Sequence, residues 1–164
     1  MTGKRRNILI GMAAGGFWGV GLIWVGLSLD IPIFSFTWIL TLAFLFPGLF
    51  LIVIIGRLAQ RRFFDDAIID GEPLTGAAAI DQRVLQNTAE QLVLALAIWP
   101  FAGQWLATEG PGVVLMLGIG FAIARIAFWA GYHISPPLRA FGFAATFYPT
   151  IIVLIWTVLW WVLN

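Results

Sequence analysis

The chain has 164 residues, of which 61% are hydrophobic and 10% are charged, and its formal net charge is +1 at pH 7. This apolar share exceeds the ~45–50% of ordinary soluble domains, and with a mean hydropathy of +0.96 it indicates an integral membrane protein. The absence of cysteine excludes disulfides, thiolate metal sites and a thiol nucleophile supplied by the protein, and the single histidine cannot form a histidine metal cluster. The nine basic residues are too few and too dispersed for a nucleic-acid-binding surface, so no nucleic-acid partner is expected.

Five apolar stretches follow one another along the chain, and each is close to the ~20 residues that cross a hydrocarbon core about 30 Å thick. They span roughly residues 8–29, 37–56, 84–107, 112–134 and 138–162. We therefore predict an all-α integral membrane protein, a bundle of about five transmembrane helices. We divide it into an N-terminal helix with its outer loop, residues 1–36, and a four-helix membrane domain, residues 37–164.

The first predicted helix has three glycines at intervals of four residues, Gly11, Gly15 and Gly19. Small residues at this spacing let membrane helices approach closely, so we expect this face to pack against another helix. Basic residues precede the helix, but its apolar run is too long for a signal peptide. We therefore expect the helix to be retained.

The positions of the basic residues predict the orientation in the membrane. If the N-terminus is cytoplasmic, eight basic residues fall on or near the cytoplasmic side, namely Lys4, Arg5, Arg6, Arg57, Arg61, Arg62, Arg83 and Arg139. The two outer loops hold none. We expect the inner membrane of a bacterium, with the C-terminus outside. The acidic residues of the long 57–83 connection are interpreted as a solvated surface, namely Asp65, Asp66, Asp70, Glu72 and Asp81.

Two of the predicted helices carry polar side chains within the membrane. Arg83, Asn87 and Glu90 follow at i, i+4 and i+7, so they share one face of the third helix. Arg125 and Tyr132 form the polar face of the fourth. Because the two helices are antiparallel, Glu90 and Arg125 both lie about 10 Å deeper than the cytoplasmic surface. A buried charge needs a partner, so we expect an ion pair between them.

Such a pair could be purely structural, with each charge neutralising the other and fixing the helix register. This interpretation leaves Arg83 and Arg139 unexplained, because both are further cations at the same mouth. A surplus of guanidinium groups suggests an anionic ligand. The segment "SPPLR" also places a proline in the first turn of the last helix, and with it Arg139 beside unpaired backbone amides. A thiol bound there would lose its proton more readily.

The pattern Arg83-x3-Asn87-x2-Glu90, followed by Arg125-x6-Tyr132-x6-Arg139, resembles that of the MAPEG family, the membrane-associated proteins of eicosanoid and glutathione metabolism. The likeness covers about residues 37–162, and the N-terminal helix is an addition to the family's four. It implies a homotrimer in the lipid bilayer. Glutathione would be the co-substrate, bound in cytoplasmic-side clefts between neighbouring subunits.

The resemblance also implies a role for each residue of the pattern. Arg83 would hold the carboxylates of glutathione and Glu90 its amino group, and the full glutathione-binding set is Arg83, Asn87, Glu90, Arg125 and Tyr132. Arg139 would be the catalytic residue, stabilising the glutathione thiolate that attacks a lipophilic electrophile or peroxide arriving from the bilayer. No metal is implied.

Two alternatives to a glutathione-dependent transferase or peroxidase remain open. Some family members have a second tyrosine where this chain has Phe128, so a hydroxyl contact to the ligand is missing. This departure and the extra helix modestly favour a non-catalytic member, acting as an accessory subunit of a larger membrane complex. The other alternative is a small transporter that uses Glu90 and Arg125 as a relay, which the clustering of polar groups at one mouth disfavours.

Overall fold

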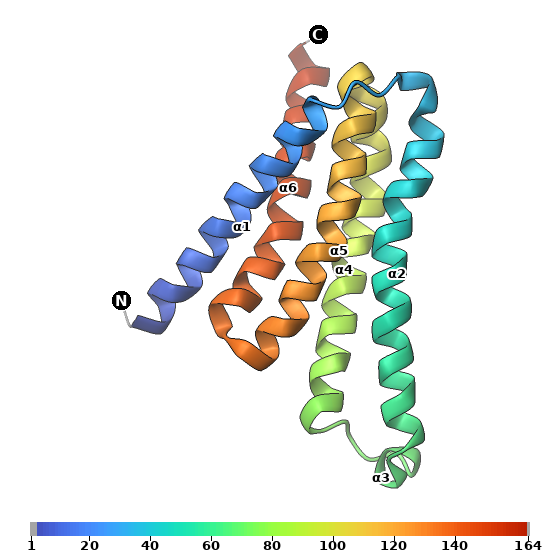
Figure 1. Cartoon of the computed structure of the whole chain (residues 1–164), viewed down its shortest axis with the longest axis vertical. Coiled ribbons are helices and arrows are strands. Elements are labelled where there is room, and N and C mark those ends of the chain that lie inside the picture. Colours follow the sequence, from blue (N-terminus) through green and yellow to red (C-terminus); the bar gives the residue numbers. More distant parts are fainter. Residues whose placement is uncertain (1–2, 164) are drawn as a thin grey trace.

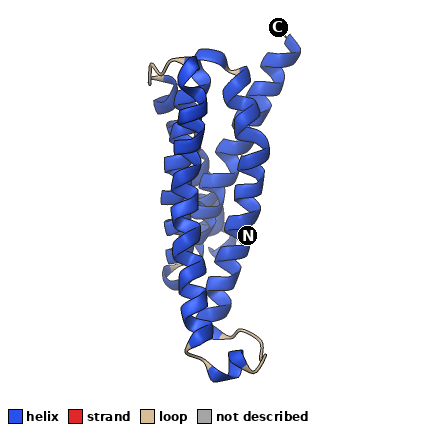
Figure 2. Ribbon diagram, turned by 90° about the vertical axis from the view of Figure 1, so that its right-hand side faces the viewer, coloured by secondary structure: helices blue, strands red, loops and turns tan. Residues whose placement is uncertain are grey.

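Five long helices form the bundle in the computed structural model, which describes residues 3–163 (Figure 1). They are α1 (Gly3–Leu27), α2 (Phe36–Phe63), α4 (Gly76–Trp105), α5 (Gly110–Ile134) and α6 (Pro136–Leu163). Three short helices lie in the connections: η1 (Ile33–Ser35), α3 (Asp66–Ile69) and η2 (Ala107–Glu109). No strand occurs within residues 3–163 (Figure 2), so the predicted all-α fold is confirmed.

Four segments are long and apolar enough to cross a membrane: Gly3–Leu27, Ile33–Phe63, Ala107–Ile134 and Pro136–Leu163. The fifth long helix, α4, does not meet the same threshold, because its first half carries charged and amide side chains. It still packs against α2, α5 and α6 within the bundle. The protein is therefore an integral membrane protein in which the most polar of the long helices packs against three apolar ones and keeps one flank exposed.

At one end of the bundle, some helices extend farther than others. α2 and α4 extend beyond the turn between α5 and α6, and the connection that contains α3 joins them there (Figure 1). The other two links, from α1 to α2 and from α4 to α5, lie at the opposite end. Only Ser135 separates α5 from α6, so these two helices are neighbours along their common length.

The glycine face of α1 packs on α6, as predicted. A Cβ atom at Gly11 would collide with the carbonyl oxygen of Pro137. One at Gly15 would come within 2.8 Å of the backbone nitrogen of Ala145, and one at Gly19 within 2.9 Å of a proline ring in α6. The two helices are therefore in close contact at all three glycines, and at Gly11 and Gly15 the backbones themselves nearly touch.

Trp99 of α4 links the membrane-embedded helices to one another. Its ring is 1% exposed, stacks on Phe44 of α2 at 5.3 Å and meets Phe121 of α5 edge to face at 6.1 Å. Its indole nitrogen donates a hydrogen bond to Thr150 of α6 at 3.2 Å. A buried tryptophan needs such a partner for its N–H, and this one is fully satisfied.

Candidate functional site

Arg125 lies in the interior of the bundle, where its side chain is fully buried. Its Nη2 atom donates to the carbonyl oxygen of Gly142 at 2.5 Å and to Thr146 Oγ1 at 2.7 Å, both on α6. Its Nη1 atom donates to Asn87 Oδ1 on α4 at 2.8 Å. Within the described residues no carboxylate lies at ion-pair distance from it, and its Nε has no hydrogen-bond partner. Neutral dipoles from two helices therefore hold this cation.

Close approach of α5 and α6 makes these bonds possible. A Cβ atom at Gly142 would come within 2.7 Å of the carbonyl oxygen of Ala124, and one at Gly131 would come within 2.8 Å of Arg139 Cβ. Glycine at both positions lets the two backbones meet. The carbonyl of Gly142 then lies within reach of the Arg125 guanidinium.

The expected ion pair between Glu90 and Arg125 is wrong. The amide of Asn87 lies between the two groups, because it accepts from Arg125 and donates through Nδ2 to Glu90 Oε2 at 3.4 Å. Glu90 also accepts a hydrogen bond from Gln86 at 3.1 Å and is exposed on the flank of α4. At i+3 from Asn87, its side chain points around the helix toward the outside of the bundle.

Arg83 lies four residues before Asn87 on the same helix and is exposed. No hydrogen bond or ion pair within residues 3–163 involves its side chain. Arg83 and Glu90 thus present opposite charges on one flank of α4, with Asn87 between them in sequence. This flank of α4 is exposed on the outside of the bundle, where a neighbouring molecule could contact it.

Tyr132 and Arg139 form a second group at the turn between α5 and α6. The guanidinium carbon of Arg139 lies 4.8 Å from the centre of the Tyr132 ring, which is a cation–π contact. α6 begins at Pro136, so a proline does occupy its first turn, as predicted, and Arg139 lies in the same turn. The backbone N–H of Arg139 donates to the Ser135 carbonyl at 3.2 Å. Both side chains are partly exposed.

Phe128 lies between the two groups. The Arg125 guanidinium carbon is 4.6 Å from the centre of its ring, and the Tyr132 ring meets it edge to face at 5.4 Å. The structure therefore places five of the six predicted residues in two adjacent groups, and Arg83 contacts neither. Asn87, Glu90 and Arg125 form a chain of contacts, and Tyr132 pairs with Arg139, with an aromatic ring in between.

A cavity of about 260 Å³ opens beside the second group. Tyr132 and Arg139 supply its polar lining, and Ile8 and Met12 of α1 form part of its apolar wall. The cavity thus combines one guanidinium group with an apolar surface. An anion or thiolate could sit at one end and an apolar group at the other.

The sequence analysis missed the environment of Asp81. Its carboxylate is fully buried, accepts a hydrogen bond from Arg61 Nε at 2.5 Å and from Trp129 Nε1 at 2.9 Å, and forms an ion pair with Arg57 at 3.7 Å. The interpretation of Asp81 as solvated surface is therefore wrong. Two arginines at i and i+4 on α2 were the available signal, because that spacing puts both on one helix face.

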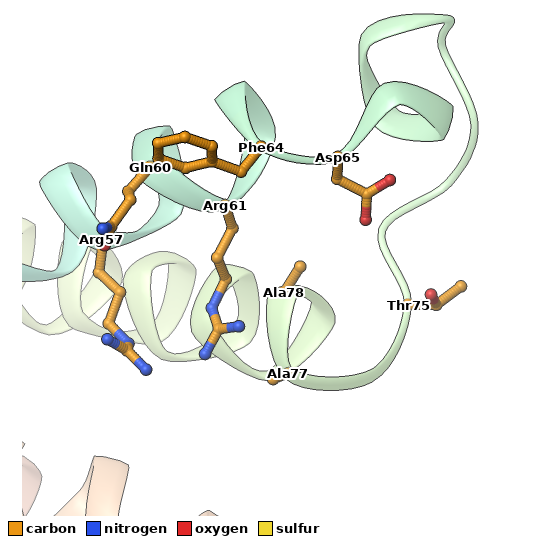
Figure 3. Close-up of a pocket in the computed structure, with 8 residues that line it drawn as sticks. All are labelled: Arg57, Gln60, Arg61, Phe64, Asp65, Thr75, Ala77 and Ala78. Atoms are coloured by element: carbon orange, nitrogen blue, oxygen red, sulfur yellow. The ribbon is translucent and has the colours of Figure 1, made fainter.

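Beside this ion pair lies a larger cavity of about 500 Å³ near the connection between α2 and α4. Figure 3 shows the guanidinium groups of Arg57 and Arg61 extending from α2 on the same side, with Asp65 and Thr75 across the opening. Neither Tyr132 nor Arg139 lines it. Within residues 3–163 no cluster of three metal-ligating side chains occurs.

The comparison with known proteins identifies the family. The model of the MAPEG family matches residues 35–159, a segment that contains every residue of the pattern described above. α1 lies before the matched segment. Searches of the curated proteins and of the solved structures each gave no match to this chain. Since the match covers well over half of an all-helical membrane protein, the chain belongs to the MAPEG family, whose members act in glutathione and eicosanoid metabolism.

Proposed function

We propose that the protein is a glutathione-dependent membrane transferase or peroxidase that acts on lipophilic electrophiles. The observation that carries this proposal is the position of Arg139, in the first turn of α6, on the face of Tyr132 and at the edge of a partly apolar cavity. A cation beside a helix N-terminus lowers the pKa of a bound thiol. The chain has no cysteine, so the nucleophilic sulfur would come from glutathione.

Arg139 would stabilise the thiolate and leave the sulfur free to attack. In a transferase reaction the sulfur forms a bond to the electrophilic carbon, and a leaving group departs with its bonding electrons. The contact with Tyr132 fixes the direction of the guanidinium group, which reduces the entropy lost when the thiolate binds. The apolar part of the cavity would receive the electrophile.

The flank of α4 would hold the rest of glutathione. Arg83 and Glu90 are exposed and opposite in charge, which suits a ligand that carries both carboxylates and an amino group. Arg125 would act indirectly, because its bond to Asn87 fixes the amide that lies next to Glu90. An exposed flank of this kind would form a closed cleft only against a second subunit, and we propose a homotrimer for that reason.

The proposal also covers the membrane in which the protein lies and its orientation there. The ligand cleft would lie at the cytoplasmic side of a bacterial inner membrane, because most basic residues lie toward the end of the bundle that carries the cleft. The N-terminus would be cytoplasmic and the C-terminus outside. A second candidate function is a non-catalytic accessory subunit, favoured by Phe128, which brings no hydroxyl to the site.

Glutathione binding to the purified protein tests the proposal. Isothermal titration of the detergent-solubilised protein should show saturable binding that Glu90→Gln weakens. Arg62→Ala should leave the binding unchanged, because Arg62 lies at the α2–α4 connection, where its side chain donates a hydrogen bond to Gln82. Conjugation of chlorodinitrobenzene and reduction of a lipid hydroperoxide should then be assayed. Glutathione binding without either reaction would support the accessory role. Absence of glutathione binding would contradict both the enzymatic function and a glutathione-binding accessory role.

A further inference from the structure

α1 contributes two side chains to the cavity that holds Arg139. Ile8 and Met12 line it, although α1 precedes the segment that the family model matches. The two residues are one turn apart and share a face of the helix. Both are half-buried, whereas Leu9 and Ile10 beside them are 51% and 60% exposed.

We propose that α1 is the outer wall of the acceptor-substrate subsite, and that Ile8 and Met12 select which lipophilic electrophile reaches the thiolate at Arg139. The proposal rests on the proposed function for the identity of the nucleophile. It adds a specificity-determining element outside the four helices of the family domain.

The position of this wall is fixed. Gly11 lies between Ile8 and Met12 in sequence, and its backbone is in close contact with the carbonyl of Pro137. Gly15 repeats the close approach one turn later, against Ala145. α1 therefore cannot move toward α6 without a clash, and the space between its side chains and Arg139 is set by backbone contact.

The lining of the cavity indicates the class of substrate. Among the described residues that line it, Arg139 is the only charged one and Tyr132 the only other polar one. The remaining ones are apolar: Ile8, Met12, Phe128, Pro136, Ala140 and Phe143. Its volume of about 260 Å³ is below the ~300–1,000 Å³ of sites that enclose drug-sized ligands. The subsite therefore fits a compact apolar electrophile, or one short apolar chain with its reactive carbon toward Arg139.

A series of α,β-unsaturated aldehydes of increasing chain length tests this selectivity. The glutathione sulfur forms a bond to the β-carbon, the electrons of the carbon–carbon double bond move toward the carbonyl oxygen, and the α-carbon takes up one proton. No leaving group, oxidant or reductant is needed. Partition of each aldehyde into the detergent is the same for every variant, so a change between variants in the kcat/KM ratio of hexenal, decenal and tetradecenal reports how the apolar chain is accommodated.

We expect the wild-type protein to prefer hexenal. Met12→Ala enlarges the subsite, so it should raise kcat/KM for tetradecenal relative to hexenal by at least about 10-fold, the lower end of the effect of one methylene group in an apolar pocket. Met12→Trp should lower kcat/KM for all three aldehydes while the glutathione thiolate absorbance is retained. Leu9→Ala and Leu9→Trp are the matched controls, because Leu9 is on the same helix but points away from the cavity.

An equal selectivity profile in Met12→Ala and Leu9→Ala would overturn the proposal. A second readout does not depend on glutathione: a diazirine-bearing hexanol should crosslink to the peptide that contains Ile8 and Met12, and Met12→Trp but not Leu9→Trp should reduce that labelling. Labelling in a protein that shows no thiolate band would refute the proposed function but retain the subsite. Absence of labelling in the presence of a thiolate band would refute the subsite alone.

Discussion

Asn87 on α4 accepts a hydrogen bond from the buried Arg125 on α5 at 2.8 Å. An amide, and not a carboxylate, is therefore the partner that α4 provides for this cation. Glu90 is left exposed, one turn farther along the same helix. The consequence for the proposed function is that Glu90 keeps its charge available for the amino group of glutathione.

The first prediction concerns this amide. Asn87→Leu leaves Arg125 Nη1 without an acceptor, so it should reduce stability by about 1–3 kcal/mol, the cost of a buried unsatisfied donor. Asn87→Asp keeps an oxygen acceptor for Arg125 Nη1, so its loss of stability should be much smaller than that of Asn87→Leu. Gln86→Ala is the control, because the hydrogen bond that Gln86 donates goes to the exposed Glu90. Thermal unfolding in detergent would measure all three, and equal melting of Asn87→Leu and the control would contradict the role given to Asn87.

The second prediction concerns Asp81. Asp81→Asn removes the charge that Arg57 and Arg61 share. Because both arginines are partly exposed and stay hydrated, we expect a loss of about 1–3 kcal/mol, the range for hydrogen bonds to a charged group. Its melting temperature should fall well below that of Asp70→Asn, a change in the exposed part of the same connection. Because neither Tyr132 nor Arg139 touches Asp81, a folded Asp81→Asn protein at low temperature should still activate thiols. Unchanged stability would mean that the ion pair is dispensable.

The third prediction separates the two parts of Tyr132. Tyr132→Phe keeps the ring under Arg139 and should leave thiolate formation nearly unchanged. Tyr132→Leu removes a contact worth about 0.5–2 kcal/mol and frees the guanidinium group, so the thiol pKa should rise toward its value in water. The pH dependence of the thiolate absorbance measures this shift. If Tyr132→Phe raised the pKa as much as Tyr132→Leu, the hydroxyl and not the ring would be the important group.

The fourth prediction tests the close packing of α1 against α6. A methyl group at Gly15 would lie 2.8 Å from the backbone nitrogen of Ala145, so Gly15→Ala should displace α1 from α6. We expect easier proteolysis of α1 and a weaker preference among aldehydes of different length. Gly21→Ala is the control, since nothing lies within 4 Å of a Cβ atom there. Identical behaviour of the two variants would show that α1 tolerates displacement.

Much of the fold could be predicted from local patterns. Apolar runs of membrane length gave the helices, and the spacing of Gly11, Gly15 and Gly19 gave the packing face, because both depend on residues near one another in sequence. The pair Pro136–Pro137 likewise indicated where α6 begins, since proline is suited to a first helical turn.

The pairing of polar side chains could not be predicted in the same way. Matched depth placed Glu90 and Arg125 at one level, but depth does not fix the rotation of each helix about its axis. That rotation decides that Asn87 faces α5 and that Glu90 faces outward. Asp81 was misjudged for a related reason, because its burial depends on how α4 packs against α2 and α5, which bring Arg61 and Trp129 to its carboxylate.

The most direct test of the central claim is the ultraviolet difference absorbance of the purified protein titrated with glutathione, with Arg139→Ala and Arg62→Ala alongside. The proposed function predicts a saturable thiolate band in the wild-type protein and in Arg62→Ala, and its loss in Arg139→Ala. Saturable glutathione binding with no thiolate band at neutral pH would contradict thiol activation at Arg139. The bundle would then be a glutathione-binding scaffold, and its buried polar residues would serve to hold the helices together.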